Sequence, residues 1–209
     1  ITGRPINELA HEHLYHSLGA YTMGFHPLES FTPEYIVPTE NDKIFRKTLV
    51  KGYVHDQGSA LLGGVAGHAG LFSNANDLAK LMQMYMQKGQ YAGVSYFDSV
   101  TVNEFIRCQF CDEENRRGIG FDKQQLEGPG PTCGCTSASS FGHSGFTGTL
   151  AWADPEEELV YIFLSNRVYP DASNTQLISL STRTRIQQVI YDAIEIPDSD
   201  TTLLSTVQP

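Results

Sequence analysis

Hydrophobic residues recur with the period of an α-helix in three long stretches of the chain, with polar residues between them. These stretches predict helices over residues 5–19, 73–88 and 174–194, the second with Ser73 as its N-cap. A shorter helix is predicted after Thr101, where a capping box precedes two apolar residues. In the last long helix, the apolar residues expected to face the core are Leu177, Leu180, Ile186, Val189, Ile190 and Ala193.

The pattern changes after residue 115, where short apolar runs alternate with turn residues. Strands are predicted over residues 117–122, 140–153 and 159–164. The last two are expected to form a hairpin around Asp154-Pro155. Prolines or glycines interrupt residues 20–62 and 123–138, which predict loops with short pieces of structure.

The order of these elements predicts one α+β domain over residues 1–196, followed by a polar tail at 197–209. The chain has 209 residues, 40% hydrophobic and 18% charged, which is enough to bury a single core. Its formal net charge is −10 and it has no Lys/Arg cluster, which argues against nucleic acid as a partner. No apolar run approaches the ~20 residues of a membrane span.

Four cysteines, Cys108, Cys111, Cys133 and Cys135, lie close together in the sequence. Four thiolates can hold a structural zinc ion, although the second pair is closer than the usual two-residue gap. The same residues can form one or two disulfides in an oxidising compartment, or remain as partly buried free thiols. The sequence leaves these states open, and no cofactor besides such a zinc ion is expected.

Several histidines are expected to have structural rather than catalytic roles. His13 and His16 lie one turn apart on a predicted exposed helix face, without the spacing of a zinc-protease motif. His68 lies in a glycine-dense turn that lacks the lysine of a phosphate-binding loop, and it is expected to be packed. His55 and Asp56 are expected to form a hydrogen-bonded pair with each other.

The string GHSGFTGT at residues 142–149 is the strongest candidate for chemistry. Its histidine, serine and glycines replace the large side chains that stabilise a strand. Such positions are tolerated where a ligand must approach the backbone N–H groups of a strand. The sequence therefore predicts a site formed by His143, Ser144, Gly145 and Phe146.

The string GHSGFTGTLAWADP, followed by LVYIFLSNR, resembles the carboxy-terminal strand pair of the serine β-lactamase-like superfamily. That superfamily includes class C β-lactamases and D-alanyl-D-alanine peptidases. The resemblance extends to VHDQGSALLGGVAGHAGLFSNANDLAKLMQMYMQKG and to the opening ITGRPINELAHEHLYHSLGA, in the family's order. Similar sequences also occur behind glycoside hydrolase family 3 domains in fused bacterial envelope proteins.

The resemblance implies a role for each residue of the candidate site. His143-Ser144-Gly145 matches the His-x-Gly form of the family's Lys-Thr-Gly motif. His143 would then stand where the family's cation meets a substrate carboxylate, and Ser144 could hydrogen-bond the same group. The backbone N–H of Phe146 would supply half of an oxyanion hole.

The family's Ser-x-x-Lys and Tyr-x-Asn motifs do not occur in the 209 residues. We therefore expect the carboxy-terminal half of a serine hydrolase that is inactive alone, self-associates, and needs the missing amino-terminal half as partner. The resemblance implies a cell-wall peptide or β-lactam-like small molecule as substrate, and a periplasmic or cell-envelope location with any signal upstream. The alternative is a catalytically silent module that binds cell wall or supports a glycoside hydrolase.

Overall fold

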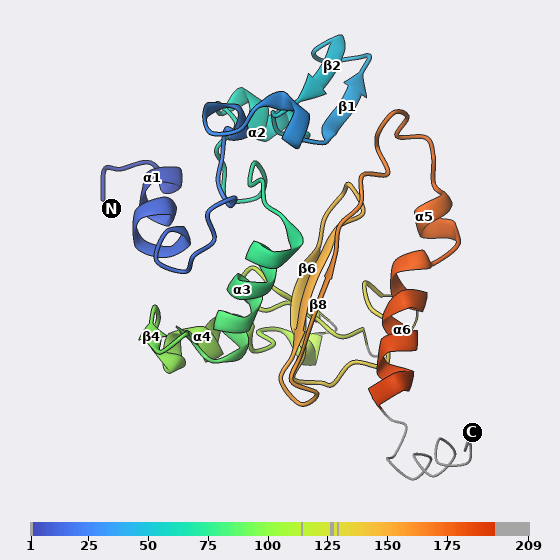
Figure 1. Cartoon of the computed structure of the whole chain (residues 1–209). Helices are drawn as coiled ribbons and strands as arrows, with labels where there is room; N and C mark the ends of the chain where they lie inside the picture. The colour runs from blue at the N-terminus through green and yellow to red at the C-terminus, as the bar shows by residue number, and fades with distance from the viewer. Residues whose placement is uncertain (1, 114, 126–127, 129, 195–209) are drawn as a thin grey trace, which may run out of the picture.

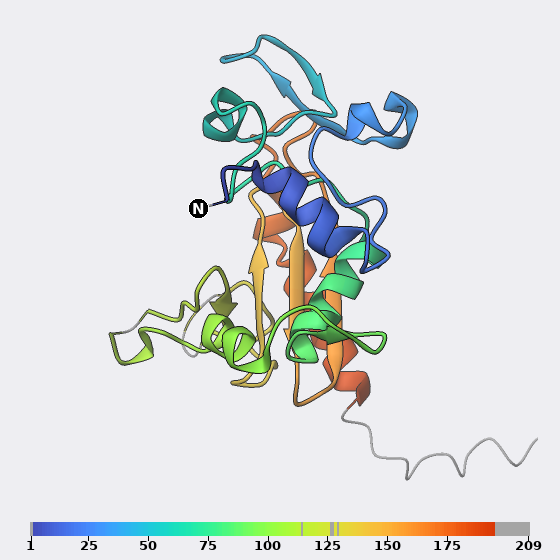
Figure 2. The ribbon, with the colours of Figure 1, turned by 90° about the vertical axis from the view of Figure 1, so that its left-hand side faces the viewer.

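A four-stranded antiparallel sheet lies at the centre of the protein, in the strand order β5-β6-β7-β8. The computed structural model describes residues 2–113, 115–125, 128 and 130–194. Helix α3 covers one face of the sheet and helix α6 covers the other (Figure 1, Figure 2). This mixed architecture confirms the predicted α+β class. The tail expected at 197–209 lies outside the described residues.

The main elements agree with the predicted order of helices and strands. The central sheet and its two covering helices are β5 (Asp122–Lys123), β6 (Phe141–Ser144), β7 (Leu150–Asp154), β8 (Leu159–Phe163), α3 (Ala75–Met86) and α6 (Thr182–Ile194). The remaining helices are α1 (Ile6–Ala10), the π-helix η1 (His11–Tyr15), α2 (Gln57–Leu61), α4 (Ser99–Ile106), α5 (Gln176–Ser179), and the 3₁₀ helices η2 (Pro27–Glu29), η3 (Pro33–Tyr35) and η4 (Cys111–Glu113). Two small hairpins contain β1 (Pro38–Asp42) with β2 (Thr48–Lys51), and β3 (Gln90–Tyr91) with β4 (Val94–Ser95). No helix among these residues is long and apolar enough to cross a membrane.

The core is divided by the sheet into two layers. Phe141 and Ala153 pack with Met82 on the α3 side. Leu150 and Trp152 pack with Tyr161 on the other side, where Ile190 of α6 joins them. Because side chains alternate along a strand, each residue of β6 and β7 can be assigned to one of these layers.

The strands confirm the predicted hairpin and correct two boundaries. β7 and β8 pair antiparallel around the turn that was expected at Asp154-Pro155. Residues 140–153 form two strands rather than one, because Gly145 donates its N–H to Thr149 and reverses the chain. Residues 117–121 form a tight turn and not a strand, closed by a bridge between Arg117 and Asp122, the first residue of β5.

The helices also begin and end differently from the prediction. Asn74, not Ser73, caps α3, and Asp98 caps α4 by accepting from the N–H of Thr101. The predicted helix over 5–19 is α-helical only at its start and continues as a π-helix. The predicted helix over 174–194 is interrupted at Ser181, whose φ of 51° is left-handed.

The predicted inner face of the last helix is largely wrong. Gln187 and Tyr191 are the residues of α6 that are buried. Their polar groups are useful there, since the Tyr191 hydroxyl donates to Asp154 over 2.7 Å and the Gln187 carbonyl accepts from the N–H of Cys133. Of the expected core residues, Leu180, Ile186 and Val189 are exposed.

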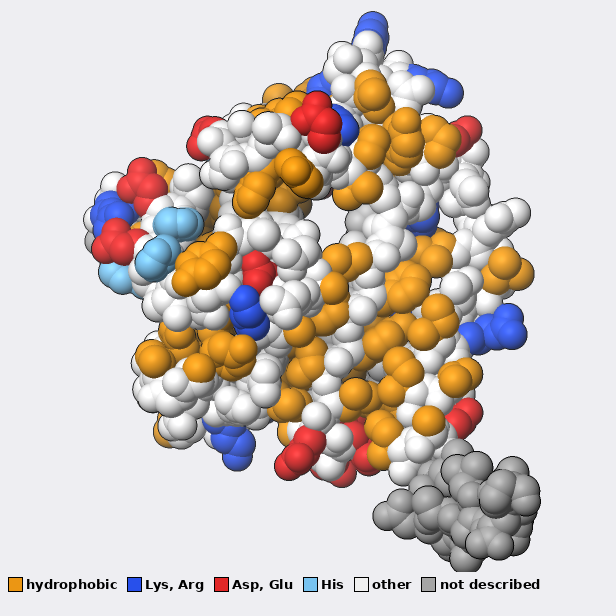
Figure 3. Space-filling view, in the orientation of Figure 1, with side chains coloured by type: hydrophobic (Ala, Val, Ile, Leu, Met, Phe, Trp, Pro, Cys, Tyr) orange, Lys and Arg blue, Asp and Glu red, His pale blue; other side chains and the backbone are white. Residues whose placement is uncertain are grey.

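The space-filling view shows hydrophobic side chains gathered around β8 and the neighbouring surface of α5 and α6 (Figure 3). β8 is the last strand of the sheet, and none of the described residues pairs with its outer edge. Leu164, which follows β8, and Val189 on α6 are among the exposed apolar residues. The sheet therefore ends at an open, apolar edge.

The cysteines form disulfides between Cys108 and Cys111 and between Cys133 and Cys135. The zinc alternative is therefore wrong, because a sulfur engaged in a disulfide is not a thiolate ligand. No cluster of metal-ligating side chains occurs elsewhere in the described part of the chain.

Candidate active site

Strand β6 places the two central residues of the predicted site on opposite faces of the sheet. His143 shares its face with Phe141, which packs on the α3 side. Ser144 lies opposite Leu150 in the register, on the α6 side. His143 and Ser144 are adjacent in the sequence, but their side chains point to opposite faces of the sheet and into different surroundings.

The imidazole of His143 has a polar contact at each nitrogen. Its Nδ1 lies 2.7 Å from the carbonyl oxygen of Ser144, and its Nε2 lies 3.0 Å from Nη1 of Arg117. Arg117 also forms an ion pair with the carboxylate of Asp122, which is only 2% exposed. Asp122 on β5 pairs with Gly142 on β6, and Arg117 lies in the turn that leads into β5.

The glycines of the motif are required by close packing within the protein, whereas the sequence suggested that they leave room for a ligand. A Cβ at Gly142 would clash with the carbonyl oxygen of Ala151 and with the ring of Trp152. A Cβ at Gly145 would clash with the hydroxyl of Thr149 inside the turn. The space that a Cβ would take at either glycine is therefore occupied by other atoms of the protein.

The turn after β6 leaves backbone donors free near the end of the strand. Gly145 donates to Thr149 over 2.8 Å, so the alternation of an antiparallel ladder directs the N–H and C=O of Ser144 away from β7. β5 ends its pairing at Gly142 and does not reach Ser144. The N–H of Phe146 has no hydrogen-bond partner among the described residues.

A cavity of about 560 Å³ adjoins this turn on the α6 side of the sheet. Ser144, Phe146, Arg167 and Arg183 are among its lining residues. None of the lining residues in the described part of the chain is acidic, although the net charge of the chain is −10. The cavity therefore presents hydrogen-bond donors and positive charge together.

Arg183 on α6 is the more buried of the two arginines. Burial lowers the pKa of its guanidinium, which remains charged because the ordinary value is so high. Its Nη1 lies 3.4 Å from the carbonyl of Gly148 and 3.3 Å from that of Thr149. Its Nε is buried without a hydrogen-bond partner among the described groups.

Arg167 and His55 lie against the aromatic ring of Phe146 beside the cavity. The Arg167 guanidinium carbon is 4.5 Å from the Phe146 ring centroid, and the His55 ring stacks on the same side chain at 5.1 Å. His55 belongs to the segment after the β1–β2 hairpin, and its Nε2 lies 3.5 Å from a carboxylate oxygen of Glu40. This contact replaces the expected pair with Asp56.

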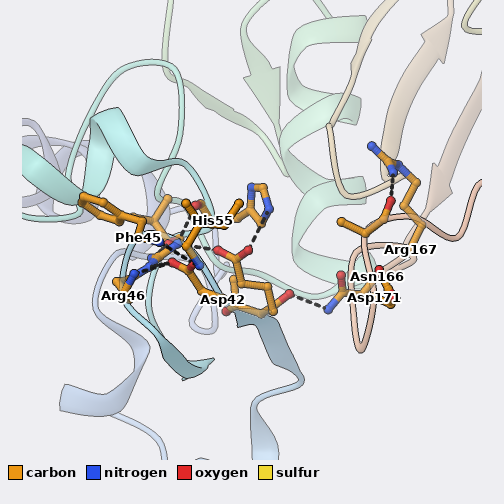
Figure 4. A network of polar contacts seen from close by, with 12 residues as sticks. Asp42, Phe45, Arg46, His55, Asn166, Arg167 and Asp171 are labelled. Atoms are coloured by element: carbon orange, nitrogen blue, oxygen red, sulfur yellow. Dashed lines mark hydrogen bonds and ion pairs between the residues drawn. The ribbon is translucent and has the colours of Figure 1, made fainter.

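A polar network holds the His55 segment in place (Figure 4). Arg46 donates to Asp42 over 2.9 Å and to the carbonyl of His55 over 2.8 Å. The Arg46 side chain, assisted by three backbone N–H groups, keeps the pKa of Asp42 well below its usual range. Asn166, after β8, donates to the carbonyl of Thr39 over 3.1 Å and so joins the β1–β2 hairpin to the sheet.

The other histidine predictions have mixed outcomes. His13 and His16 are exposed, as expected. His68 is exposed rather than packed, and its Nε2 lies 3.0 Å from Asp56, the residue that caps α2. The pKa of Asp56 is lowered by the Ser59 N–H and then by His68.

Three arginines near the candidate site could not be found from the sequence. Arg117, Arg167 and Arg183 lie in three separate segments and form no cluster along the chain. One signal was available in the sequence. Arg167 comes shortly after the predicted buried strand at 159–164, and polar residues at the end of such a strand lie near the edge of the sheet. Their convergence depends on the fold.

The fold and the motif on β6 define a β-lactamase-like domain, and the chain belongs to the Beta-lactamase family, which it matches over residues 1–181. Two solved structures are similar in fold. A β-lactamase from Mycobacterium bovis superposes with a TM-score of 0.60 and 17% identity, covering 93% of this chain and 58% of that one. A penicillin-binding protein homologue from Caulobacter crescentus gives 0.52 and 19%, covering 78% and 47%.

Similarity in sequence is higher to proteins from Salmonella. A protein of Salmonella typhi, whose name assigns it provisionally as a D-alanyl-D-alanine carboxypeptidase, is 34% identical over 190 residues. A protein of Salmonella newport with the same name gives the same identity. Each alignment covers 85% of this chain and 44% of the relative, so the chain spans less than half the length of these curated proteins.

Proposed function

We propose that these 209 residues form the carboxy-terminal part of a serine hydrolase that transfers the acyl group of an amide or ester. A cell-wall peptide or a β-lactam-like small molecule is the proposed substrate, and the cell envelope or periplasm the proposed location. The observation that carries the proposal is the cavity beside β6, which is lined by Ser144, Phe146 and two arginines and by no acidic residue in the described part of the chain. Family membership supports the reaction class.

The donors around the cavity suit the two negative charges of such a reaction. The Phe146 N–H can stabilise an oxyanion, whose charge develops as the carbonyl is attacked. Arg183 and Arg167 can bind a substrate carboxylate, because guanidinium–carboxylate hydrogen bonds are charge-assisted. In this proposal Ser144 and Gly145 form the end of β6 beside the cavity, and the side chain of His143 lies on the opposite face of the sheet.

The nucleophile would come from residues outside these 209, since no Ser-x-x-Lys occurs among them. We therefore expect the chain alone to be inactive and to require an amino-terminal half of the same domain. The same missing motif favours a second candidate, a silent accessory or cell-wall-binding module attached to another hydrolase, such as a glycoside hydrolase family 3 domain.

The test compares the chain alone with the protein extended upstream to the length of its relatives. The extended protein should be labelled covalently by a fluorescent penicillin and should release D-alanine from a peptide ending in D-Ala-D-Ala, whereas the chain alone should do neither. Absence of both activities in a folded extended protein would favour the accessory module.

The Arg183→Met variant of the extended protein tests the cavity itself. Loss of a charge-assisted hydrogen bond should raise KM for the peptide roughly 10- to 100-fold. Arg185→Met is the matched control, because Arg185 lies on the same helix but is exposed and does not line the cavity. Equal KM values in the two variants would contradict the proposed carboxylate contact.

A further inference from the structure

The contacts of His143 determine which ring nitrogen carries the proton. A carbonyl oxygen only accepts hydrogen bonds, so Nδ1 must be the donor to Ser144 over 2.7 Å. A guanidinium only donates, so Nε2 must accept from Arg117 over 3.0 Å. The two contacts together are compatible with one form of the ring, the neutral tautomer with its hydrogen on Nδ1.

Arg117 is itself held in position by buried structure. Its Nη1 also forms an ion pair with the buried side chain of Asp122, the first residue of β5. The Arg117 carbonyl accepts from the N–H of Gln109 over 2.8 Å, and its backbone pairs with Asp122 across the tight turn. The side chain is 46% exposed, yet both ends of the residue are fixed.

We propose that Arg117 is a positioning residue that holds His143 in the Nδ1–H tautomer and supplies the permanent positive charge beside β6. An imidazole that accepts from a guanidinium is not the cation of the pair. The positive charge beside His143 therefore belongs to Arg117, which is paired with Asp122, and His143 in turn donates to the carbonyl of Ser144. The consequence for catalysis rests on the proposed hydrolase function, whereas the tautomer does not.

The first test is the nitrogen NMR spectrum of the His143 ring in the protein, by long-range ¹H–¹⁵N correlation. The wild type should show a protonated Nδ1 and an unprotonated Nε2. Arg117→Met should shift the ring toward the Nε2–H tautomer or a mixture, and Arg117→Lys, which keeps a charged donor, should restore the wild-type pattern. An Nε2–H or doubly protonated ring in the wild type near pH 7.5 would overturn the proposal without any variant.

Arg4→Met is the matched control. Arg4 is 43% exposed and paired with Glu12, like Arg117 with Asp122, but it precedes α1. It should leave the His143 nitrogen shifts unchanged. Circular dichroism of each variant establishes that the fold is retained, and the lysine variant keeps Asp122 paired if the methionine variant fails to fold.

The second test measures activity in the extended protein. Arg117→Met should lower kcat/KM by up to about 10²-fold, the effect of misplacing a reacting group, and Arg117→Lys should recover most of it. Unchanged kcat/KM in an active Arg117→Met protein would overturn the positioning role. If the extended protein hydrolyses nothing, the proposed function fails, while the NMR result still decides the tautomer.

Discussion

The ring of His55 lies on the ring of Phe146, with centroids 5.1 Å apart and planes inclined by 29°. The two residues belong to distant parts of the chain, one after the β1–β2 hairpin and the other in the turn after β6. The stack therefore connects the segment held by Arg46 to the rim of the candidate cavity.

We expect His55→Ala to lower the free energy of unfolding by about 0.5–1.5 kcal/mol, the range measured for pairs of aromatic rings. Urea denaturation followed by circular dichroism measures this change. His13→Ala is the control, because His13 is exposed and its carboxylate contact is long, at 3.6 Å. Equal stability of the two variants would mean that the stack does not hold the segment to the sheet.

Lys123 on β5 predicts a dependence of stability on alkaline pH. Burial lowers the pKa of its ammonium to about 8, although the carboxylate of Asp154 acts in the opposite direction. The unfolded chain therefore binds more protons than the folded protein between about pH 8 and the ordinary lysine pKa. Stability must rise with pH through that interval, as the cost of burying the charge is removed.

Lys123→Met should lack this contribution. The stability of the wild type relative to Lys123→Met should increase between pH 8 and pH 10 by at most about 3 kcal/mol, measured as the difference in free energy of unfolding. The comparison between the two proteins cancels the titration of the tyrosines. A constant difference over this interval would show that Lys123 is not buried as a cation.

The two disulfides should contribute little stability, because each closes a very short loop. The joined cysteines are separated by three and two positions, and the loop-entropy relation then gives about 2 kcal/mol or less for each bond. Cys133→Ser combined with Cys135→Ser should lower the free energy of unfolding by no more than this amount. A thiol reagent should find no reactive cysteine in the denatured, unreduced protein, and bound zinc would contradict the pairing.

The open edge of β8 predicts that the isolated chain self-associates, since an unpaired apolar strand can pair with another molecule. Light scattering at micromolar concentration should show a dimer or larger species. Val189→Lys should weaken this association, because Val189 is 66% exposed on the adjacent α6. Val100→Lys is the control on α4, where Val100 is 76% exposed. A monomeric wild-type chain would contradict the prediction.

Local patterns in the sequence predicted the elements whose signal lies within a few residues. The apolar run at 159–164 and the Asp154-Pro155 turn indicated the β7–β8 hairpin, and the helical period after residue 73 indicated α3. The same reasoning failed for α6, where Ile186 and Val189 are apolar but exposed. An amphipathic period identifies a helix, but it does not show whether another element covers the apolar face of that helix.

The candidate site shows the same limit more clearly. The motif at 142–149 marked the correct strand end, because unusual residues in a strand are visible in the sequence. The side chains around that strand end were not visible, since Arg117 reaches His143, and Arg183 reaches the turn after β6, only through the pairing of β5 and the packing of α6. Such contacts depend on tertiary structure, and no spacing along the chain encodes them.

The side chains of His143 and Ser144 point to opposite faces of the sheet. The number of residues in β6 is therefore more constrained than the identity of each residue. A shift of one residue in the pairing with β7 would turn the imidazole toward the arginine-lined cavity and the hydroxyl toward Arg117. Gly142 against Trp152 resists that shift, because every other residue of β6 carries a Cβ that would clash there. His143 and Ser144 can therefore be substituted independently of each other. A single insertion or deletion within β6 would instead exchange the faces of the sheet to which their side chains point.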